Sequence, residues 1–217
     1  TQEMNFLLSQ SVDGIITDYP QDLICLNTLL MNSGKIAEWQ FDNNSGNIIL
    51  DNTGKLNTGI INNANWSNGI NGSCLDFNGT SSYVSLPLNS STDQISEAVS
   101  ISVWINLNQL PSNMNHPYGP IYDSDQDSYI MYLDKANAEL RFKVKDLSGD
   151  TERPGIPENY LTTGNWHHVV GVYNNEDALI YLDGMLIDNH YNPDIDTLIS
   201  GQIAEIGRNN GSYFNGK

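Results

Sequence analysis

The chain contains few basic residues. Its 217 residues include nine Lys and Arg against 26 Asp and Glu, which gives a formal net charge of −17. So few cations do not predict a basic patch, and binding to nucleic acid depends on such a patch. The same negative field opposes contact with an anionic membrane. The composition therefore predicts no nucleic-acid partner, and the excess carboxylates fit either calcium binding or simple solubility outside a cell.

Cysteines and long apolar runs are also scarce. Cys25 and Cys74 allow at most one disulfide, and because they fall in different predicted units the sequence leaves their pairing open. No apolar run is long enough to span a bilayer and no signal peptide is visible, so we expect no membrane insertion. Because the first residue is Thr1 and not Met, we interpret the chain as a fragment or mature portion.

Helix-forming Lys, Arg and Ala are few, whereas Asn, Ser, Thr, Gly and Asp are abundant, which favours turns and strand edges. From about residue 35 the chain shows short strand patterns separated by Gly, Asn and Ser, as in an all-β sandwich. Residues 36–41 predict the first strand. Residues 129–133 and 139–144 predict a hairpin, and Asn78-Gly79 predicts another between residues 75–77 and 83–86. The clearest alternation puts four apolar residues on one face: Val99, Ile101, Val103 and Ile105.

Residues 166–184 carry the strongest local signal. Residues 166–173 and 179–182 read as two strands joined by the polar turn at residues 174–177. Asp183-Gly184 supplies a second tight turn, because Gly adopts a positive φ without steric cost. We expect the other strands to pack against this hairpin.

The order of these segments resembles the laminin G-like, concanavalin A-like jelly roll. The resemblance covers about 180 residues and rests on the following segments: 37–42 (AEWQFD), 72–79 (GSCLDFNG), 83–84 (YV), 100–105 (SISVWI), 166–173 (WHHVVGVY), 181–184 (YLDG), 206–207 (IG) and 214–216 (FNG). It implies a two-sheet antiparallel sandwich over residues 35–217. The family's last strand, of the type I-D-E-V-R-I-Y, has no counterpart before Lys217, so we expect that strand to be missing and its slot to be unpaired.

Residues 1–34 differ from the rest of the chain in their apolar spacing, which predicts helix, strand and helix in that order. The apolar spacing at residues 4–8 and 23–30 is helical, and residues 12–17 form a short apolar run before Pro20. Residues 12–20 (VDGIITDYP) resemble the last strand of a glycerophosphodiester phosphodiesterase barrel. The resemblance implies a C-terminal barrel remnant followed by a linker, from a hydrolase that uses calcium or magnesium; a chance α/β-like linker is the alternative.

Catalysis by this chain alone is not expected. The His-Arg and Glu-x-Asp motifs of the glycerophosphodiester phosphodiesterases are absent, and most of their barrel would be missing. On the sandwich, related glucanases place two carboxylates on one strand face, and no such pair is visible here. The neighbouring His167 and His168 point to opposite faces of a strand, so they cannot serve one site and are expected to be scaffold.

For metal binding, residues 123–127 resemble the first half of a calcium loop. The loop lacks Gly at its sixth position and has Asp134 at the twelfth, so an EF-hand is not expected, and either loose calcium binding or a solvated loop fits. Jelly rolls of this type commonly hold one structural calcium near the chain ends. By position, the candidate ligands are Asp42, Asp51 and Asp76.

For ligand binding, two irregular loops carry aromatic and polar side chains suited to a sugar-binding rim, where a flat ring stacks and polar groups contact hydroxyls. The alternative is that both loops pack on their own sandwich. From residues 113–127 the candidates are His116, Tyr118, Tyr122, Asp123 and Asp125. From residues 146–165 the candidates are Arg153 and Tyr160.

Together these expectations give one functional hypothesis. The chain is a non-catalytic module that binds carbohydrate or another cell-surface ligand, at the C-terminal side of a secreted hydrolase resembling glycerophosphodiester phosphodiesterases. The alternative is a protein-binding adhesion domain with no enzymatic partner. Both hypotheses place the protein outside the cell or on its surface.

Overall fold

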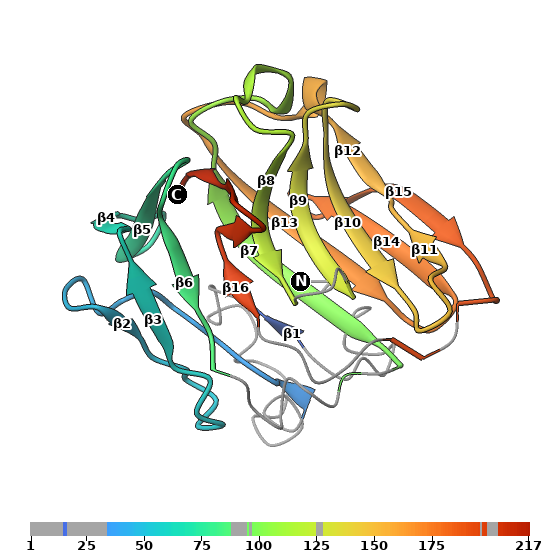
Figure 1. Ribbon diagram of the computed structural model, residues 1–217, viewed down its shortest axis with the longest axis horizontal. Coiled ribbons are helices and arrows are strands. Elements are labelled where there is room, and N and C mark those ends of the chain that lie inside the picture. Colours follow the sequence, from blue (N-terminus) through green and yellow to red (C-terminus); the bar gives the residue numbers. More distant parts are fainter. Residues whose placement is uncertain are drawn as a thin grey trace.

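A computed structural model shows two large β-sheets stacked face to face (Figure 1). The structure describes residues 34–87, 95, 97–124, 128–195, 197–198 and 204–217, together with the backbone of Ile15–Ile16. The predicted all-β sandwich is confirmed. The two helices predicted within residues 1–34 lie outside the described residues.

The first sheet contains the predicted hairpin at its centre. Its strand order is β1-β7-β13-β14-β15, with β1 parallel to β7 and the other pairs antiparallel. The strands are β1 (Ile15–Ile16), β7 (Val99–Asn106), β13 (Trp166–Tyr173), β14 (Asp177–Leu182) and β15 (Met185–Tyr191). The predicted strand at residues 12–17 is therefore present at two positions, where its backbone pairs with the sandwich.

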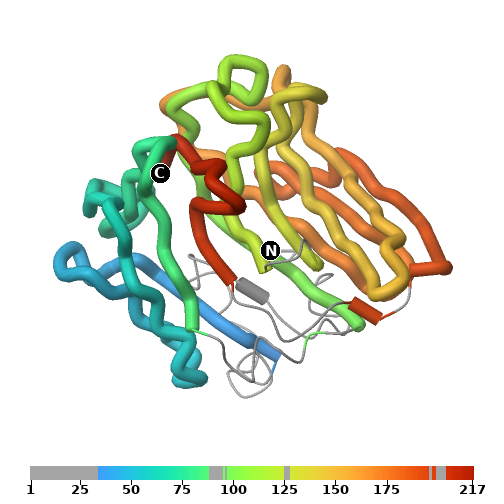
Figure 2. Tube along the Cα trace, in the orientation of Figure 1, coloured from blue at the N-terminus to red at the C-terminus, as the bar shows by residue number. Residues whose placement is uncertain are grey.

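The second sheet has nine strands, in the order β11-β10-β9-β8-β16-β6-β3-β2 with β12 paired to β10. Its strands are β2 (Ile48–Ile49), β3 (Gly59–Asn62), β6 (Tyr83–Ser85), β8 (Tyr118–Asp123), β9 (Tyr129–Asp134), β10 (Glu139–Lys145), β11 (Thr151–Glu152), β12 (Gly155–Pro157) and β16 (Glu205–Ile206). Figure 2 shows the C-terminal segment, in red, running between β6 and β8, where β16 pairs with both.

Smaller elements cover the ends of the sandwich. One three-stranded sheet contains β4 (Asn65–Asn68), β5 (Ser73–Asn78) and β19 (Asn215–Gly216), and a two-stranded hairpin contains β17 (Arg208–Asn209) and β18 (Ser212–Tyr213). Two 3-10 turns, η2 (Pro111–Asn113) and η3 (Glu158–Tyr160), lie in the loops before β8 and after β12.

The core lies between the two large sheets and follows the period-2 alternation of the strands. In β10, Leu140, Phe142 and Val144 are fully buried while the residues between them are half-buried. The predicted apolar face of β7 also belongs to this core. The sheets approach closely at Gly171 of β13, where an added Cβ would lie 2.5 and 2.9 Å from two ring carbons of Phe142.

The hairpin at residues 166–184 is confirmed, including both turns. Val169 pairs with Leu182 and Tyr173 with Ala178. The second turn joins β14 to β15 through Asp183 and Gly184, both of which have a positive φ, of 49° and 84°. Two consecutive positive φ angles are typical of the type I′ turn, whose twist matches the strands that it connects.

Two local predictions are wrong. Asn78-Gly79 does not join a hairpin, because β5 and β6 belong to different sheets. Instead the Asn78 side-chain oxygen accepts hydrogen bonds from the backbone amides of residues 80–82, which redirects the chain between the sheets. Residues 36–41 do not form a strand either, although Trp39 is buried and donates its indole N–H to the Asn57 carbonyl at 2.7 Å.

Cys74 is buried and its thiol donates to the Asn68 carbonyl, and Cys25 lies outside the described residues. No helix in the described ranges is long and apolar enough to cross a membrane.

The close approach of the sheets yields a stability prediction. Gly171→Ala forces a methyl group into the Phe142 ring, so the two sheets must separate or the ring must move. We expect a loss of roughly 1–3 kcal/mol in the free energy of unfolding, measured by urea denaturation. In a Phe142→Leu background the same change should cost clearly less; equal costs in both backgrounds would contradict this account.

Candidate functional site

A pocket of about 490 Å³ lies on strands β8, β9 and β10 of the nine-stranded sheet. Tyr118 stands at its edge with 49% of its surface exposed, and Tyr132 lies deeper, with 6% exposed. The two rings meet edge to face with centroids 5.7 Å apart. The residues that line the pocket are Pro117, Tyr118, Pro120, Ile130, Tyr132, Lys143, Arg153, Asn209, Asn210 and Ser212.

Strand register explains why these residues meet. Tyr132 of β9 lies opposite Pro120 of β8 and Arg141 of β10, and Ile130 lies opposite Lys143. Because Phe142 faces the core, the residues on either side of it face outward. Residues far apart in sequence therefore form one surface of two aromatic rings, an apolar floor and a cation.

The β17–β18 hairpin closes one side of the pocket. Asn210 and Gly211 both have a positive φ, which makes the tight turn between the two strands. Asn209, Asn210 and Ser212 thereby bring amide and hydroxyl groups next to the aromatic rings. The pocket thus offers both flat apolar surface and hydrogen-bonding groups.

The structure brings together only some of the predicted ligand residues. Tyr118 and Arg153 both line the pocket, although they come from different predicted loops. His116 is half-buried in the loop before β8, and Tyr160, which is 51% exposed in η3, does not line this pocket. Asp125 lies outside the described residues.

Tyr122 and Asp123 are buried, so neither forms a rim. Tyr122 is 3% exposed and stacks on Tyr129 with ring centroids 6.0 Å apart. Its burial, helped by Tyr129, raises the pKa of the phenol well above its usual value, so it stays neutral. Asp123 lines an adjacent polar pocket of about 320 Å³ together with Glu205 and Arg208.

Sequence reasoning missed Tyr132, Lys143 and the β17–β18 residues. The alternation in residues 139–145 was a usable signal for Lys143, because it places every second residue of the strand on one face. β9 carries no such signal, since all six of its residues are buried. Asn209, Asn210 and Ser212 lie far from β8, β9 and β10 in sequence, and they reach the pocket only because the chain folds back to it.

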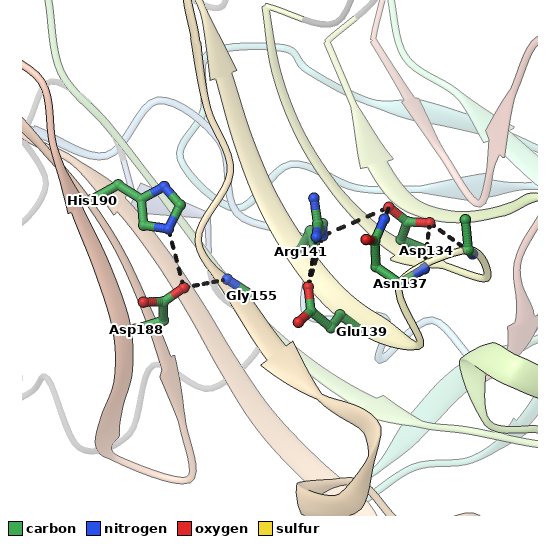
Figure 3. A network of polar contacts seen from close by, with 8 residues as sticks. Asp134, Asn137, Glu139, Arg141, Gly155, Asp188 and His190 are labelled. Carbon is green, nitrogen blue, oxygen red and sulfur yellow. Dashed lines mark hydrogen bonds and ion pairs between the residues drawn. The ribbon is translucent and has the colours of Figure 1, made fainter.

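A network of polar contacts extends from the pocket strands (Figure 3). Arg141 pairs with Glu139 at 2.8 Å and with Asp134 at 3.6 Å. Asp188 of β15 accepts the Gly155 amide at 3.0 Å and contacts His190 at 3.3 Å. This second group ties the β12 strand of one sheet to β15 of the other.

The predicted calcium ligands do not form one site. Among the described residues no group of three or more His, Cys, Asp or Glu side chains could hold a metal ion. Asp51 is occupied by its own chain: Oδ1 accepts from Thr53 and the Glu38 amide, and Oδ2 accepts from Thr53 and from the backbone and side chain of Asn57. Asp42 is exposed, and Asp76 lies half-buried on β5.

The histidine pair points to opposite faces, as expected. His167 donates from Nδ1 to Asp183 at 2.9 Å, and its Nε2 accepts from the Thr162 amide at 3.1 Å. His168 stacks on Trp104 and has its Nε2 2.8 Å from the Ser102 hydroxyl. Burial lowers the pKa of His168, although Asp183 acts against it. Trp104 therefore packs on the same outer face of the sheet as His168.

Comparison with known proteins gives a family and a fold. A family model described as the concanavalin A-like lectin/glucanases superfamily matches residues 78–217. No curated protein matches the chain in sequence.

Solved structures with the same fold include receptor-binding and other binding domains. The receptor binding domain of botulinum neurotoxin C/D mosaic serotype has a TM-score of 0.61 at 15% identity, over 76% of this chain and 41% of that one. The binding domain of Paraclostridial Mosquitocidal Protein 1 has a TM-score of 0.61 at 16% identity, over 78% and 44%. The botulinum neurotoxin serotype D ligand binding domain, in complex with N-acetylneuraminic acid, has a TM-score of 0.59 at 18% identity, over 76% and 41%. This chain thus spans less than half of each.

The hydrogen bonds around Asp51 yield a pH prediction. Burial alone would raise the pKa of Asp51, but the donors from Thr53, Asn57 and Glu38 outweigh it and lower the pKa below 3.8. Its stabilising effect is therefore present above about pH 4 and is lost as the pH falls through the lowered pKa. We expect Asp51→Asn to lower the free energy of unfolding by roughly 1–2 kcal/mol at pH 7.

Unfolding in urea at pH 7 and at pH 3 tests this, and the difference between wild type and Asp51→Asn should shrink at the lower pH. Asp42→Asn, at an exposed carboxylate, is the matched control and should change little at either pH. A difference for Asp51→Asn that is independent of pH would refute the explanation.

Proposed function

Because the chain belongs to the concanavalin A-like lectin/glucanase superfamily, we propose that it is a non-catalytic module that binds carbohydrate in the pocket on β8, β9 and β10. The observation that carries the proposal is the half-exposed Tyr118 ring beside Tyr132, with the amides of Asn209 and Asn210 at the same pocket. A sugar presents a flat C–H face and a rim of hydroxyls, which such a combination contacts together.

The lining of the pocket supports binding without cleavage. Glycoside hydrolysis uses two carboxyl groups, one as acid and one as base or nucleophile. Among the described residues, neither Asp nor Glu lines this pocket. The related domain crystallised with N-acetylneuraminic acid gives a glycan ligand some further support by analogy of fold.

We further propose, on the resemblance of residues 12–20 alone, that the module accompanies a glycerophosphodiester phosphodiesterase-like hydrolase outside the cell. The resemblance gives residues 1–34 as the end of its barrel and residues 35–217 as the binding module. Upstream coding sequence with the family's His-Arg and Glu-x-Asp motifs would support this arrangement, and upstream sequence without them would refute it.

A protein-binding adhesion domain is the second candidate function, and one surface favours it. Strand β2 lies at an edge of the nine-stranded sheet, where Ile48 pairs with Ile60 of β3. Both are substantially exposed, at 39% and 53%, as are the neighbouring Leu50 and Leu56 at 47% and 78%. Exposed apolar residues on a sheet edge are a common feature of interaction surfaces.

The carbohydrate proposal is tested by removing the edge ring. Tyr118→Ala should weaken binding to a glycan ligand found on a glycan array by about tenfold, because stacking on an aromatic face contributes on the order of 1 kcal/mol or more. Tyr160→Ala is the matched control, since Tyr160 is equally exposed but lies outside the pocket. Equal losses for both variants, or no glycan bound by the wild type, would rule the pocket out.

A further inference from the structure

Strand β15 of the five-stranded sheet contacts the nine-stranded sheet through one histidine. The Nδ1 atom of His190 lies 2.8 Å from Oε2 of Glu152 on β11, and its Nε2 atom lies 3.3 Å from Oδ2 of Asp188 on its own strand. Figure 3 shows that the same Asp188 oxygen also accepts the Gly155 amide of β12, at 3.0 Å. One imidazole ring thus joins two carboxylates that belong to the two sheets of the sandwich.

These contacts lie on both sides of Arg153, which lines the pocket. Glu152, directly before it, is held by His190 and by the side chain of Asn192, which donates to Oε1 at 2.9 Å. Gly155, two residues after it, donates to Asp188. The backbone on each side of a pocket residue is therefore held by side chains of β15 and of the residue that follows the strand.

The segment around Arg153 is otherwise weakly paired. The ladder with β10 is interrupted at Arg153 and Pro154, between β11 and β12. Pro154 has no N–H, so it offers β10 only its carbonyl, which accepts the Phe142 amide at 3.1 Å. The place of Arg153 matters for the aromatic floor, because burial raises the pKa of Tyr132 and the charge of Arg153 acts against that effect.

The protonation state of His190 decides whether both contacts form. Only a protonated imidazole donates a hydrogen bond from each nitrogen. A neutral ring keeps one N–H, and the shorter contact, to Glu152, favours keeping it on Nδ1. The Nε2 lone pair then faces Asp188 and repels the oxygen that accepts the Gly155 amide. Loss of one proton therefore weakens the contact between β15 and β12.

The surroundings of His190 leave this change of charge to two carboxylates. Within the part of the chain that the structure describes, the titratable groups that contact the ring are Glu152 and Asp188, and on β14 it lies opposite Ala178. The His190 side chain is 39% exposed, so the ring exchanges protons with the solvent. A histidine typically changes its charge between pH 5 and 8.

We propose that His190 is a positioning residue of the carbohydrate pocket: when protonated it joins Glu152 to Asp188 and holds Arg153 in place, and loss of the proton releases this segment. The inference rests on the proposed function and adds regulation by pH to it. Because the protonated state is the one that makes both contacts, carbohydrate is bound more tightly in mildly acidic than in mildly basic solution.

The contact itself is tested without any ligand. The exchange rate of the Gly155 amide, measured by NMR and divided by the intrinsic rate at each pH, reports how often its hydrogen bond to Asp188 opens. We expect its protection to fall at least about fivefold from pH 5.5 to pH 8.0 in the wild type. His190→Gln, which carries no charge at either pH, should show the low protection at both. A wild-type protection that does not depend on pH would overturn the inference.

Two further variants separate this effect from a general change in charge. Asp188→Asn keeps an oxygen that accepts the Gly155 amide but removes the charge that His190 contacts, so the protection should become independent of pH. Asp194→Asn removes an exposed carboxylate beyond the end of β15 and is the matched control, which should behave as the wild type. The same change in both variants would overturn the role of His190. Thermal unfolding verifies that each variant is folded.

The consequence for the pocket is measured on an array of neutral oligosaccharides at pH 5.5 and pH 8.0. The wild type should bind at least about fivefold more weakly at pH 8.0, and His190→Gln should bind weakly at both. Binding that is independent of pH, while the Gly155 protection changes, would overturn the positioning of Arg153 and leave carbohydrate binding intact. Failure to bind any oligosaccharide at either pH would overturn the proposed function and, with it, this regulation.

Discussion

The close contact between Gly171 and Phe142 restricts how the two sheets pack and, through that, which residues of β10 face the pocket. A ring this close to a backbone carbon tolerates no side chain at residue 171, and it holds β10 in one orientation against β13. Because a strand alternates its faces, fixing Phe142 inward also fixes Arg141 and Lys143 outward. A shift of one residue in β10 would bury both cations and expose Phe142. The core contact and the pocket surface are therefore two consequences of the same register.

The distribution of charge matters more in this molecule than its sum. A net charge of −17 describes the field at a distance, where ions in solution screen it. Among the described residues, the lining of the pocket contains Lys143 and Arg153 but no Asp or Glu, and neutral Asn and Ser residues of β17 and β18 close one side of it. Arg141 marks the boundary, since it belongs to the same face but is paired with Glu139 and Asp134 (Figure 3).

The sequence predicted those parts of the fold that depend on residues close together in the chain. The hairpin at residues 166–184 and the β9–β10 pair follow from alternation and from turn residues, and both are present. The Asn78-Gly79 prediction failed because the same side chain that favours a tight turn can also cap a wider one. Of the candidate site, only Tyr118 and Arg153 were predicted, since Tyr132 and Asn209 reach the pocket through strand order that no short pattern encodes.

The hydrogen bonds of His167 resemble those of a catalytic group, but they hold the hairpin in place. The Thr162 hydroxyl lies 2.8 Å from Nε2 and Asp183 lies 2.9 Å from Nδ1, which is the spacing of a nucleophile, a base and the carboxylate that orients the base. However, the Thr162 backbone amide already donates to Nε2, so its lone pair is not available to take a proton from the hydroxyl. Asp183 also accepts the His168 amide at 2.8 Å, so this group closes the hairpin turn. The titratable side chains around His167 stabilise the scaffold, and the pocket on β8, β9 and β10 is lined by rings, amides and cations, which suits the proposed binding of a ligand without cleavage.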